Sequence, residues 1–496
     1  MGSPGQIPYR SFIHIDRAST TPVYMQVTHQ LINAIQRGYL LTGTKLPGTR
    51  LLSSTLAVHR KTIIAVYEEL DAQGWIEIRP NKGSFVLQKK DAKGKRISTE
   101  KQNLLAYYPE KTGYSFEKSS LLDNPFEFSS CHYSFNDGTP DIRLTQIEQL
   151  SKFYSSNIKR KSNLKKLGYH NSDGSEYFKE NLSNYLNLSR GLHISKENIL
   201  ITRSTEMSVY IISEILLRAL DIVVVASLSY FSVNMIFQKS GARIVQVPVD
   251  EEGIQVDALE KLCRQYTIRM LYLTPHHHYP TTVSLTAERR VALLDLAHQY
   301  GFIILEDDYD YDFHYDQKAL LPLASADTNG MVIYIGAFGK SLAPGFRTGF
   351  IVAPQNVMAE MRKYLGIIDR QGDVLMEMVL AEMIAEGEIN RHLKKSIKIY
   401  QERRNLFVNI LNQTFGENIH FQQPSGGLAV WVQWKNPINL LQVSQECRKE
   451  QLFIPKNLLY QHKDLTAMRL GFGHMNKEEM NSSLAILKRN IDVLTK

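Results

Sequence analysis

A lysine, an arginine, an aspartate and a tyrosine stand near the ends of two expected strands. Lys340 follows a short apolar run, and Arg347 comes seven residues later within the segment YIGAFGKSLAPGFR. Asp307 and Tyr309 follow a second apolar run about thirty residues upstream. A lysine amine forms Schiff bases, a carboxylate faces a pyridinium nitrogen, and an arginine holds a phosphate. This combination predicts a pyridoxal phosphate site, with either Asp307 or the adjacent Asp308 facing the ring.

The elements that must position these residues follow an alternating pattern from about Cys131 onward. Expected strands lie at 222–226, 243–247, 270–274, 302–306 and 332–335, and expected helices at 207–219, 232–240, 287–300 and 358–365. Strands that alternate with helices predict an α/β domain at 131–496, with a mainly parallel sheet covered by helices on both faces. A small C-terminal α+β subdomain completes it. Because ligands bind at the carboxyl ends of such strands, we expect residues 274–282, 307–309 and 336–347 to lie together.

The length and composition indicate a multidomain cytoplasmic protein. A chain of 496 residues exceeds one ordinary core, and 43% hydrophobic residues is usual for a globular protein. The three cysteines, Cys131, Cys263 and Cys447, are far apart and form neither a metal motif nor a disulfide framework. We expect no signal peptide and no membrane span.

Positive charge is concentrated at the N-terminus. Before residue 97 there are 14 Lys and Arg against 6 Asp and Glu, which accounts for the whole net charge of +8. This asymmetry favours an anionic partner for the first domain, with double-stranded DNA as the leading candidate and a merely solvated surface as the alternative.

The first 88 residues have the pattern of a winged helix-turn-helix. Three amphipathic helices are expected at 22–37, from about Arg50, and through 63–70, followed by a hairpin across 75–87. The third helix begins with basic and hydroxyl residues, and a major groove would admit that end. We therefore expect Arg60, Lys61 and Thr62 to reach phosphates and base edges, and Lys82 on the hairpin to reach the DNA backbone.

Residues 89–130 are expected to form an extended linker. The stretch KKDAKGKRISTEKQ is charged and nearly free of large apolar residues. Six aromatic residues in the second half are candidates for docking on a surface: Tyr107, Tyr108, Tyr114, Phe116, Phe126 and Phe128.

The N-terminal block resembles the GntR-type winged helix domain, through PVYMQV (22–27), LPGTR (46–50), VYEEL at the end of the third helix and GWIEIRPNKGSFV (74–86). The resemblance implies that Arg50, Arg60, Lys61, Thr62 and Gly83 contact DNA. His59 stands where the family usually has a serine that caps the recognition helix. Histidine is a poorer cap, so we expect a less firmly fixed helix start.

The remainder resembles a fold-type I aminotransferase domain and, behind a GntR-type domain, the MocR/GabR family of regulators. The motifs that carry the resemblance are FNDGTPD (135–141), LGYHNSDGS (167–175), NLSRG (187–191), TPHHHYPTT (274–282), EDDYDYDF (306–313), YIGAFGK and MRLGFG (468–473). By this resemblance Lys340 is the catalytic Schiff-base lysine, Asp307 pairs with the pyridinium nitrogen, and Tyr309 bonds the phenolic oxygen of the ring. Tyr230 stacks on the ring, and Arg347 holds the phosphate.

The same resemblance assigns an effector and a dimer contact. Arg469 matches the arginine that binds an incoming amino acid's carboxylate, and Tyr169 matches a tyrosine that reaches the phosphate in a neighbouring subunit, which implies a homodimer. A core role for Tyr230 and a structural ion pair for Arg469 are the alternatives. Three consecutive histidines at 276–278 look like a metal site, but neighbours on a loop cannot all face one ion, so we expect no metal.

The site departs from the family in three places. Ala337 and Gly339 stand where the family has hydroxyl residues, and the phosphate loop carries an acid, Glu206. Ser204, Thr205 and the following helix N-terminus still suit a phosphate dianion. Each lost hydroxyl removes about 1 kcal/mol of hydrogen bonding, so we expect weaker cofactor retention.

Three functions remain open at this point. The favoured one is a DNA-binding transcription regulator, associated with the nucleoid, that senses pyridoxal phosphate or its adduct with an amine or amino acid. The second is an active aminotransferase that carries a winged helix, and the third is a regulator whose large domain no longer binds the cofactor. The basic N-terminal domain argues against the second, and the intact Lys340, Asp307, Tyr309 and Arg347 argue against the third.

Overall fold

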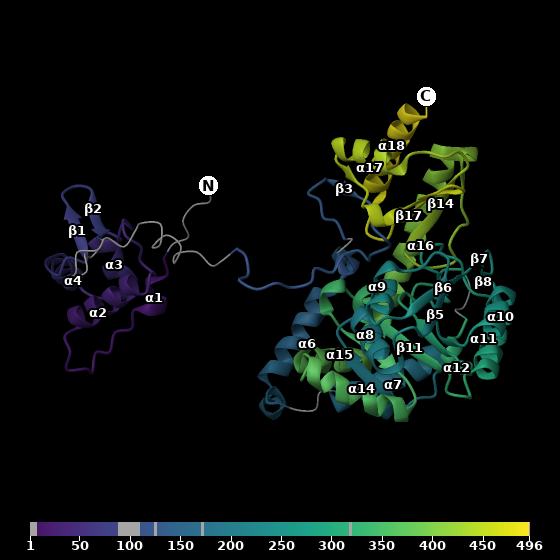
Figure 1. Cartoon of the computed structure of the whole chain (residues 1–496), viewed down its shortest axis with the longest axis horizontal. Helices are drawn as coiled ribbons and strands as arrows, with labels where there is room; N and C mark the ends of the chain where they lie inside the picture. Colours follow the sequence, from purple (N-terminus) through teal and green to yellow (C-terminus); the bar gives the residue numbers. More distant parts are fainter. Residues whose placement is uncertain (1–6, 88–109, 124–125, 170–172, 317–319, 496) are drawn as a thin grey trace. The chain divides into compact units, whose positions relative to one another are not determined.

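The computed structural model describes residues 7–87, 110–123, 126–169, 173–316 and 320–495. The chain divides into two compact units, Met1–Lys118 and Ser119–Lys496 (Figure 1). The expected linker at 89–130 falls across this division, and most of it lies outside the described residues. Within its described part only the short turn Ser120–Leu122 is regular. Phe126 packs against Phe231 with ring centroids 5.5 Å apart, whereas Phe128 is exposed.

The N-terminal unit has the expected three helices and a hairpin in order, preceded by one short additional helix, α1. Its elements are α1 (Tyr9–Phe12), α2 (Val23–Gln36), α3 (Thr49–Leu56), α4 (Arg60–Ala72), β1 (Ile76–Arg79) and β2 (Gly83–Val86). The apolar face of α4 lies against α2, and both contribute fully buried residues such as Val27, Leu31, Ile63 and Val66. The predicted winged helix-turn-helix is confirmed.

A seven-stranded sheet is the centre of the second unit. Its strands run in the order β4 (Ile199–Thr202), β12 (Gly349–Val352), β11 (Val332–Ala337), β10 (Ile303–Asp307), β9 (Ile268–Leu273), β5 (Ile222–Ala226) and β6 (Arg243–Val247). All neighbouring pairs are parallel except those of β12, which is antiparallel to β11 and β4. The predicted, mainly parallel sheet is confirmed, with the strands at 222–226 and 243–247 at their expected bounds.

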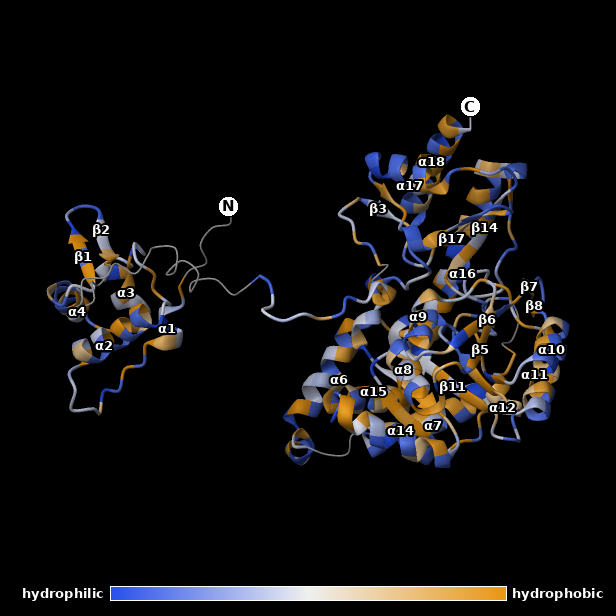
Figure 2. Ribbon diagram, in the orientation of Figure 1, coloured by the Kyte–Doolittle hydropathy of each residue, from blue (hydrophilic) through white to orange (hydrophobic). Residues whose placement is uncertain are grey.

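Helices cover both faces of this sheet, as its alternating side chains require. In β5, Val223 and Val225 belong to one apolar cluster and Val224 to another, because successive side chains point to opposite faces. The first cluster includes helices α8 (Thr205–Leu216), α9 (Phe231–Lys239) and α14 (Gln355–Ile368), and the second includes α10 (Val256–Gln265), α11 (Ala287–Tyr300) and α12 (Leu323–Ala326). Figure 2 shows the apolar residues gathered around β11.

A third cluster packs on the β4–β12–β11 end of the sheet. It brings in α7 (Glu176–Arg190), α15 (Val374–Ala385) and the first half of the long helix α16 (Glu388–Phe415), with α6 (Ile147–Lys159) beside them. A two-stranded ribbon of β7 (Val249–Asp250) and β8 (Gly253–Ile254) lies outside the main sheet.

The C-terminal subdomain has its own antiparallel sheet, as expected for an α+β unit. Strands β13 (Ile419–His420), β14 (Ala429–Trp434), β17 (Leu465–Gly471) and β16 (Leu459–His462) pair in that order. The second half of α16 packs with α17 (Leu440–Lys449) and α18 (Lys477–Leu494) in one core. The short strands β15 (Leu452–Phe453) and β3 (Tyr133–Ser134) form a parallel pair.

A glycine loop joins this subdomain to the segment after β10. The N–H of Gly427 donates to the carbonyl oxygen of Phe313 at 2.8 Å. The N–H of Tyr315 donates to the carbonyl oxygen of Ser425 at 3.0 Å. A Cβ atom on Gly426 would stand 2.3 Å from Nε2 of the buried His277. Only glycine permits this approach. In the described parts of the chain, no helix is long and apolar enough to cross a membrane.

Candidate functional site

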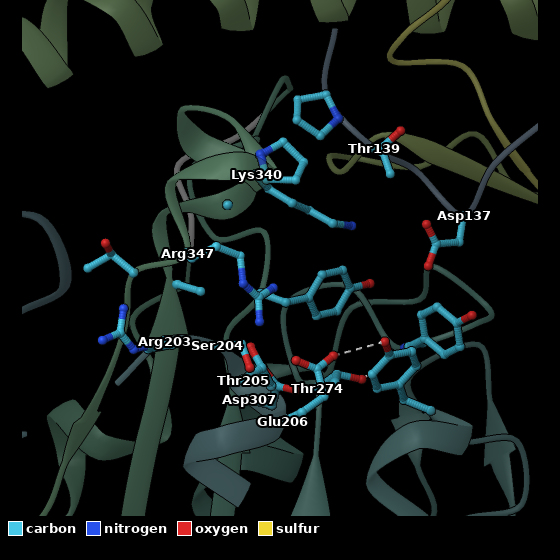
Figure 3. A pocket seen from close by; sticks show the side chains of 18 of the residues that line it. Asp137, Thr139, Arg203, Ser204, Thr205, Glu206, Thr274, Asp307, Lys340 and Arg347 are labelled. Carbon is cyan, nitrogen blue, oxygen red and sulfur yellow. Dashed lines mark hydrogen bonds between the residues drawn. The ribbon is translucent and has the colours of Figure 1, made fainter. Parts of the chain in front are cut away.

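A cavity of about 240 Å³ opens at the carboxyl ends of the central strands. Seven of the predicted cofactor residues line it: Lys340, Asp307, Tyr309, Tyr230, Arg347, Ser204 and Thr205. They come from five separate stretches, and the fold brings them together as the strand-end argument requires. Figure 3 shows the labelled members around the cavity, with Arg347, Ser204 and Thr205 on the side away from Asp137.

Lys340 lies on the short helix α13 (Phe338–Ser341), directly after β11. Its Nζ atom stands 4.4 Å from the centroid of the Tyr309 ring. Burial lowers the pKa of this amine, and the negative charges of Asp310 and Asp137 oppose that shift. A lowered lysine pKa leaves more unprotonated amine at neutral pH, which is the form that attacks a carbonyl carbon.

Of the two adjacent aspartates, Asp307 and Asp308, Asp307 is the one that lines the cavity. Its Oδ2 atom accepts a hydrogen bond from the Tyr272 hydroxyl at 2.8 Å, whereas its buried Oδ1 atom has no partner in the described residues. Burial, with an added contribution from the charge of Glu206, raises the pKa of Asp307 to about 8 despite the Tyr272 bond. The next residue, Asp308, points to the other face of the sheet and pairs with Nδ1 of His276 at 3.0 Å. The sequence did not show whether Asp307 or Asp308 faces the site, and in the structure Asp307 is the residue that lines the cavity.

One end of the cavity suits an anion. Ser204 caps the N-terminus of α8, where its Oγ atom accepts from the Met207 N–H at 3.2 Å, and Thr205 follows it. Arg347 lines the same cavity, and its guanidinium has no hydrogen-bond or ion-pair partner among the residues described. A helix N-terminus beside an exposed arginine with no partner has the features that a phosphate needs, and phosphate binding here stays a prediction. The lining also contains Ala337 and Gly339, so the two expected hydroxyls are missing from the wall itself.

The two predicted tyrosines both line the cavity but make different contacts. The Tyr309 hydroxyl donates to the carbonyl oxygen of His277 at 2.7 Å. The Tyr230 hydroxyl donates to Oε1 of Glu206 at 3.3 Å, and the Tyr230 ring lies edge-on to Tyr279 with centroids 5.0 Å apart. Ring stacking by Tyr230 and hydrogen bonding by Tyr309 to a cofactor stay predictions.

Arg469 and Tyr169 do not line the cavity. Arg469 is fully buried and donates to the carbonyl oxygens of Asp137 at 3.0 Å and Pro280 at 2.8 Å, and to the Tyr309 hydroxyl at 3.4 Å. Tyr169 is exposed, with the Arg370 guanidinium 4.4 Å from its ring centroid. An exposed position is what a contact with a second subunit would need, and both roles remain predictions.

Several cavity residues were missing from the sequence-based set. Tyr272, Asp137 and Tyr279 all line the cavity. Tyr272 could have been found from the sequence, because it lies near the end of an expected strand, and this strand, β9, pairs with the strand of Asp307. Asp137 and Tyr279 lie on loops whose course depends on the tertiary fold, although both stand inside motifs that carry the family resemblance.

The three consecutive histidines face different partners. His276 pairs with Asp308, His277 with Asp310 at 2.8 Å, and Nδ1 of His278 bonds the Thr281 hydroxyl at 2.7 Å. Burial lowers the pKa of His278 to about 4, with the positive charge of Arg469 acting in the same direction. The described residues contain no group of three or more metal-ligating side chains.

The side chains of the cavity fit pyridoxal phosphate. The unpartnered Oδ1 of Asp307 suits a pyridinium N–H, the unpaired Arg347 and the start of α8 suit the phosphate, and Lys340 has its amine in the cavity. Glu206 is the one lining group whose charge opposes a phosphate on the same wall.

Replacing Glu206 with glutamine should therefore strengthen cofactor binding. Removing the negative charge ends its repulsion of the phosphate and lowers the raised pKa of Asp307, so we expect about tenfold tighter binding of pyridoxal phosphate, a gain of about 1.4 kcal/mol. Titration of the apo-protein followed by absorbance measures it. Glu417→Gln, on an exposed turn of the C-terminal subdomain, is the matched control, and an unchanged affinity for Glu206→Gln would contradict the expected repulsion.

The N-terminal unit presents a second candidate site, at the start of α4. Arg50, Arg60, Lys61 and Lys82 are exposed, and Thr62 is half-buried. His59 does cap this helix, since its Nδ1 atom accepts from the Lys61 N–H at 3.2 Å, and a less firmly fixed helix start stays a prediction. Gly83 begins β2 with a φ of +113°, a conformation that favours glycine.

Comparison with known families assigns both units. Residues 126–487 match the family of class I and II aminotransferases, and residues 23–86 match the bacterial regulatory proteins of the gntR family. The uncharacterized HTH-type transcriptional regulator YisV of Bacillus subtilis is 24% identical over 94% of this chain and 96% of its own length. The probable rhizopine catabolism regulatory protein MocR of Rhizobium meliloti is 26% identical over 84% of this chain and 82% of its own length.

Solved structures agree with this assignment. The kynurenine aminotransferase of Pyrococcus horikoshii, crystallised with PMP, superimposes with a TM-score of 0.68 at 25% identity, covering 74% of this chain and 92% of that one. An archaeal alanine:glyoxylate aminotransferase gives a TM-score of 0.69 at 25% identity, over 73% of this chain and 91% of its own. The chain therefore belongs to the class I and II aminotransferase family and, with its gntR-family domain, has the architecture of a MocR-type transcription regulator.

Proposed function

We propose that this regulator senses pyridoxal phosphate, or its adduct with an amine or amino acid, and alters its contact with double-stranded DNA in response. The observation that carries the proposal is the cavity, in which Lys340, Arg347 and Oδ1 of Asp307 are all left without hydrogen-bond or ion-pair partners within the described ranges. Lys340 and Oδ1 of Asp307 are withdrawn from water without gaining a partner, which costs free energy in a purely structural scaffold, and the exposed Arg347 is free to bind an anion at the mouth of the cavity.

Pyridoxal phosphate, when bound, supplies a carbonyl carbon that accepts amines and a ring that withdraws electrons. Lys340 would hold the cofactor covalently through its unprotonated amine, with the carbonyl oxygen leaving as water. Asp307 would hold a proton on the ring nitrogen through Oδ1, while Tyr272 keeps the carboxylate in place from the other side. Arg347, Ser204 and Thr205 would bind the phosphate, and Tyr230 and Tyr309 would fix the plane and position of the ring.

The remaining assignments belong to the same proposal. We place the DNA-binding domain at residues 1–88, a linker at 89–130 and the effector domain at 131–496. The protein acts as a nucleoid-associated homodimer in the cytoplasm, with Tyr169 reaching the partner's phosphate site and Arg469 holding an effector carboxylate. Exposed Tyr169 supports the first role, and the closeness of Arg469 to Tyr309 supports the second.

DNA contact by the start of α4 gives a direct prediction. Lys61→Ala removes one exposed charge from the helix end that enters the groove, so binding should weaken across all DNA sequences and the salt dependence of log K should fall by about one. Fluorescence anisotropy on a labelled duplex at several salt concentrations measures both. Lys463→Ala, exposed in the C-terminal subdomain, is the control, and an unchanged salt slope for Lys61→Ala would place the contact elsewhere.

The sensing itself is tested by a mobility-shift assay on the region upstream of the protein's own operon, with and without pyridoxal phosphate, together with transcription in vitro. A change in the bound pattern or in transcript level is the expected result. Identical binding and identical transcription in both conditions would exclude sensing of the cofactor. An assay for transamination with candidate amines then separates a sensor from an enzyme.

A further inference from the structure

Asp137 presents a carboxylate to the cavity from a loop with a fixed main chain. The Asn136 side chain accepts hydrogen bonds from the N–H groups of the two residues after Asp137, at 2.9 and 3.0 Å. Arg469 donates to the Asp137 carbonyl oxygen at 3.0 Å, and the Gly471 N–H donates to that of Asn136 at 2.8 Å. Since these bonds hold the chain on both sides, the side chain of Asp137 is preorganised to meet a ligand.

The Asp137 carboxylate has no partner of its own. It is half-buried in the cavity wall and takes part in no hydrogen bond or ion pair within the ranges that the structure describes. The other two acids of the cavity differ, because Asp307 accepts from Tyr272 and Glu206 accepts from Tyr230. A carboxylate that has lost part of its water without gaining a partner favours the arrival of a cation.

The surroundings of Asp137 also suit a cation. Tyr230, Tyr279 and Tyr309 line the cavity, with Tyr279 centred 5.0 Å from Tyr230 and 6.4 Å from Tyr309. Tyrosine rings bind positive charge through their faces, and Lys340 already uses Tyr309 in this way. Figure 3 shows the Lys340 amine on the side of the cavity where Asp137 lies.

We propose that this end of the cavity selects an amino compound with a second positive charge, a diamine or a basic amino acid, and that Asp137 binds that charge. The inference rests on the proposed function, since the first amine is the one that reacts at the cofactor. Among the cations that line the cavity, Lys340 lies nearest to Asp137. Its amine is no longer available to Asp137 when it holds the cofactor. The buried Arg469 bonds the main-chain oxygen of Asp137 and not its carboxylate, so that carboxylate keeps a free face at the end of the cavity away from Arg347.

The test compares amines that differ only at their far end. The full-length protein loaded with pyridoxal phosphate is titrated with diaminopentane, hexylamine and aminohexanoate, which end in an ammonium, a methyl and a carboxylate group. Changes in the cofactor's absorption and calorimetry both report binding. We expect diaminopentane to bind at least about tenfold more tightly than hexylamine, as for one charge-assisted hydrogen bond. Aminohexanoate reports separately on whether Arg469 holds a carboxylate at the same end. L-Lysine, added as a fourth probe, shows whether a carboxylate is accepted beside the reacting amine.

The ratio between diaminopentane and hexylamine isolates the role of Asp137. Any general effect of its charge on Lys340 changes both amines alike and cancels, so Asp137→Asn should bring the ratio close to one. Asp464→Asn makes the same charge change at an exposed turn and should leave the ratio as it is. Asp137→Ser serves as a second variant if the first melts at a lower temperature.

Two outcomes overturn the proposal. If the wild-type protein binds all three amines equally, or if its preference survives in Asp137→Asn, Asp137 does not select a cation, while the sensing of amines stands. If no cofactor spectrum can be obtained at all, the proposed function fails and this inference fails with it.

Discussion

Replacing Lys340 with alanine should abolish the visible absorption that the protein acquires with pyridoxal phosphate. Lys340 is the lysine in the lining of the cavity, and burial lowers the pKa of its amine, so it is the group available to bond the carbonyl carbon. The phosphate and ring contacts do not depend on it, and weak, reversible binding should remain. Spectra of the wild-type and variant proteins after removal of free cofactor measure the loss.

The same variant should still bind DNA. The basic start of α4 belongs to the other compact unit, whose core does not include any residue of the cavity. We therefore expect Lys340→Ala to bind a labelled duplex as the cofactor-free wild type does, and to stop responding when pyridoxal phosphate is added. Lys239→Ala, on a helix away from the cavity lining, is the control. A variant that kept the full absorption band would show that another amine holds the cofactor.

Replacing Asp307 with asparagine should weaken cofactor binding while stabilising the cofactor-free protein at high pH. The pKa of Asp307 is raised to about 8, so between about pH 4 and pH 8 the folded protein holds a proton that the unfolded chain has released. The contribution of this group to the free energy of unfolding therefore falls as pH rises through that window. Asparagine cannot ionise, and the gain at pH 8 should be on the order of a few kcal/mol.

Thermal unfolding at pH 5 and pH 8 tests this prediction, with Asp308→Asn as the matched variant. Asp308 is equally buried, but its pairing with His276 and Tyr334 lowers its pKa despite burial, so its removal should destabilise the protein. Asp307→Asn should gain stability chiefly at pH 8 and should also bind pyridoxal phosphate at least about tenfold more weakly, because an amide cannot balance a pyridinium charge. Equal stability of wild type and Asp307→Asn at both pH values would contradict the raised pKa.

Two strands of the central sheet, β5 and β6, were predictable from the sequence to the residue. The valine-rich run at 222–226 is flanked by Asp221 and Ser227, and the run at 243–247, on the edge strand, is flanked by Ala242 and Pro248. Both strands begin and end where expected. The sequence analysis did not identify β4 and β12, because each has only four residues and the order of strands along the sheet is not a local property. The antiparallel direction of β12 follows from its short connection to β11, which contains α13 and Lys340.

The sequence predicted which residue types form the candidate site, but not the hydrogen-bond partners of those residues. Residue types and motifs identified Lys340, Asp307 and Arg347, and the fold brings all three to one cavity. No pattern distinguished Asp307 from Asp308, since the choice depends on which face of the sheet each side chain takes. The bonds of Arg469 reach residues at 137, 280 and 309, and such distant partners are set only by the complete fold.

The glycine loop of the C-terminal subdomain is joined to the cavity wall through His277. Gly426 rests against His277, and the carbonyl oxygen of His277 receives the hydroxyl of Tyr309, which forms part of the cavity wall. A side chain on Gly426 would have to displace His277, and the hydrogen bond from Tyr309 joins His277 to the cavity wall. Gly426→Ala should therefore alter the cavity wall from the C-terminal subdomain, without changing any residue that lines the cavity.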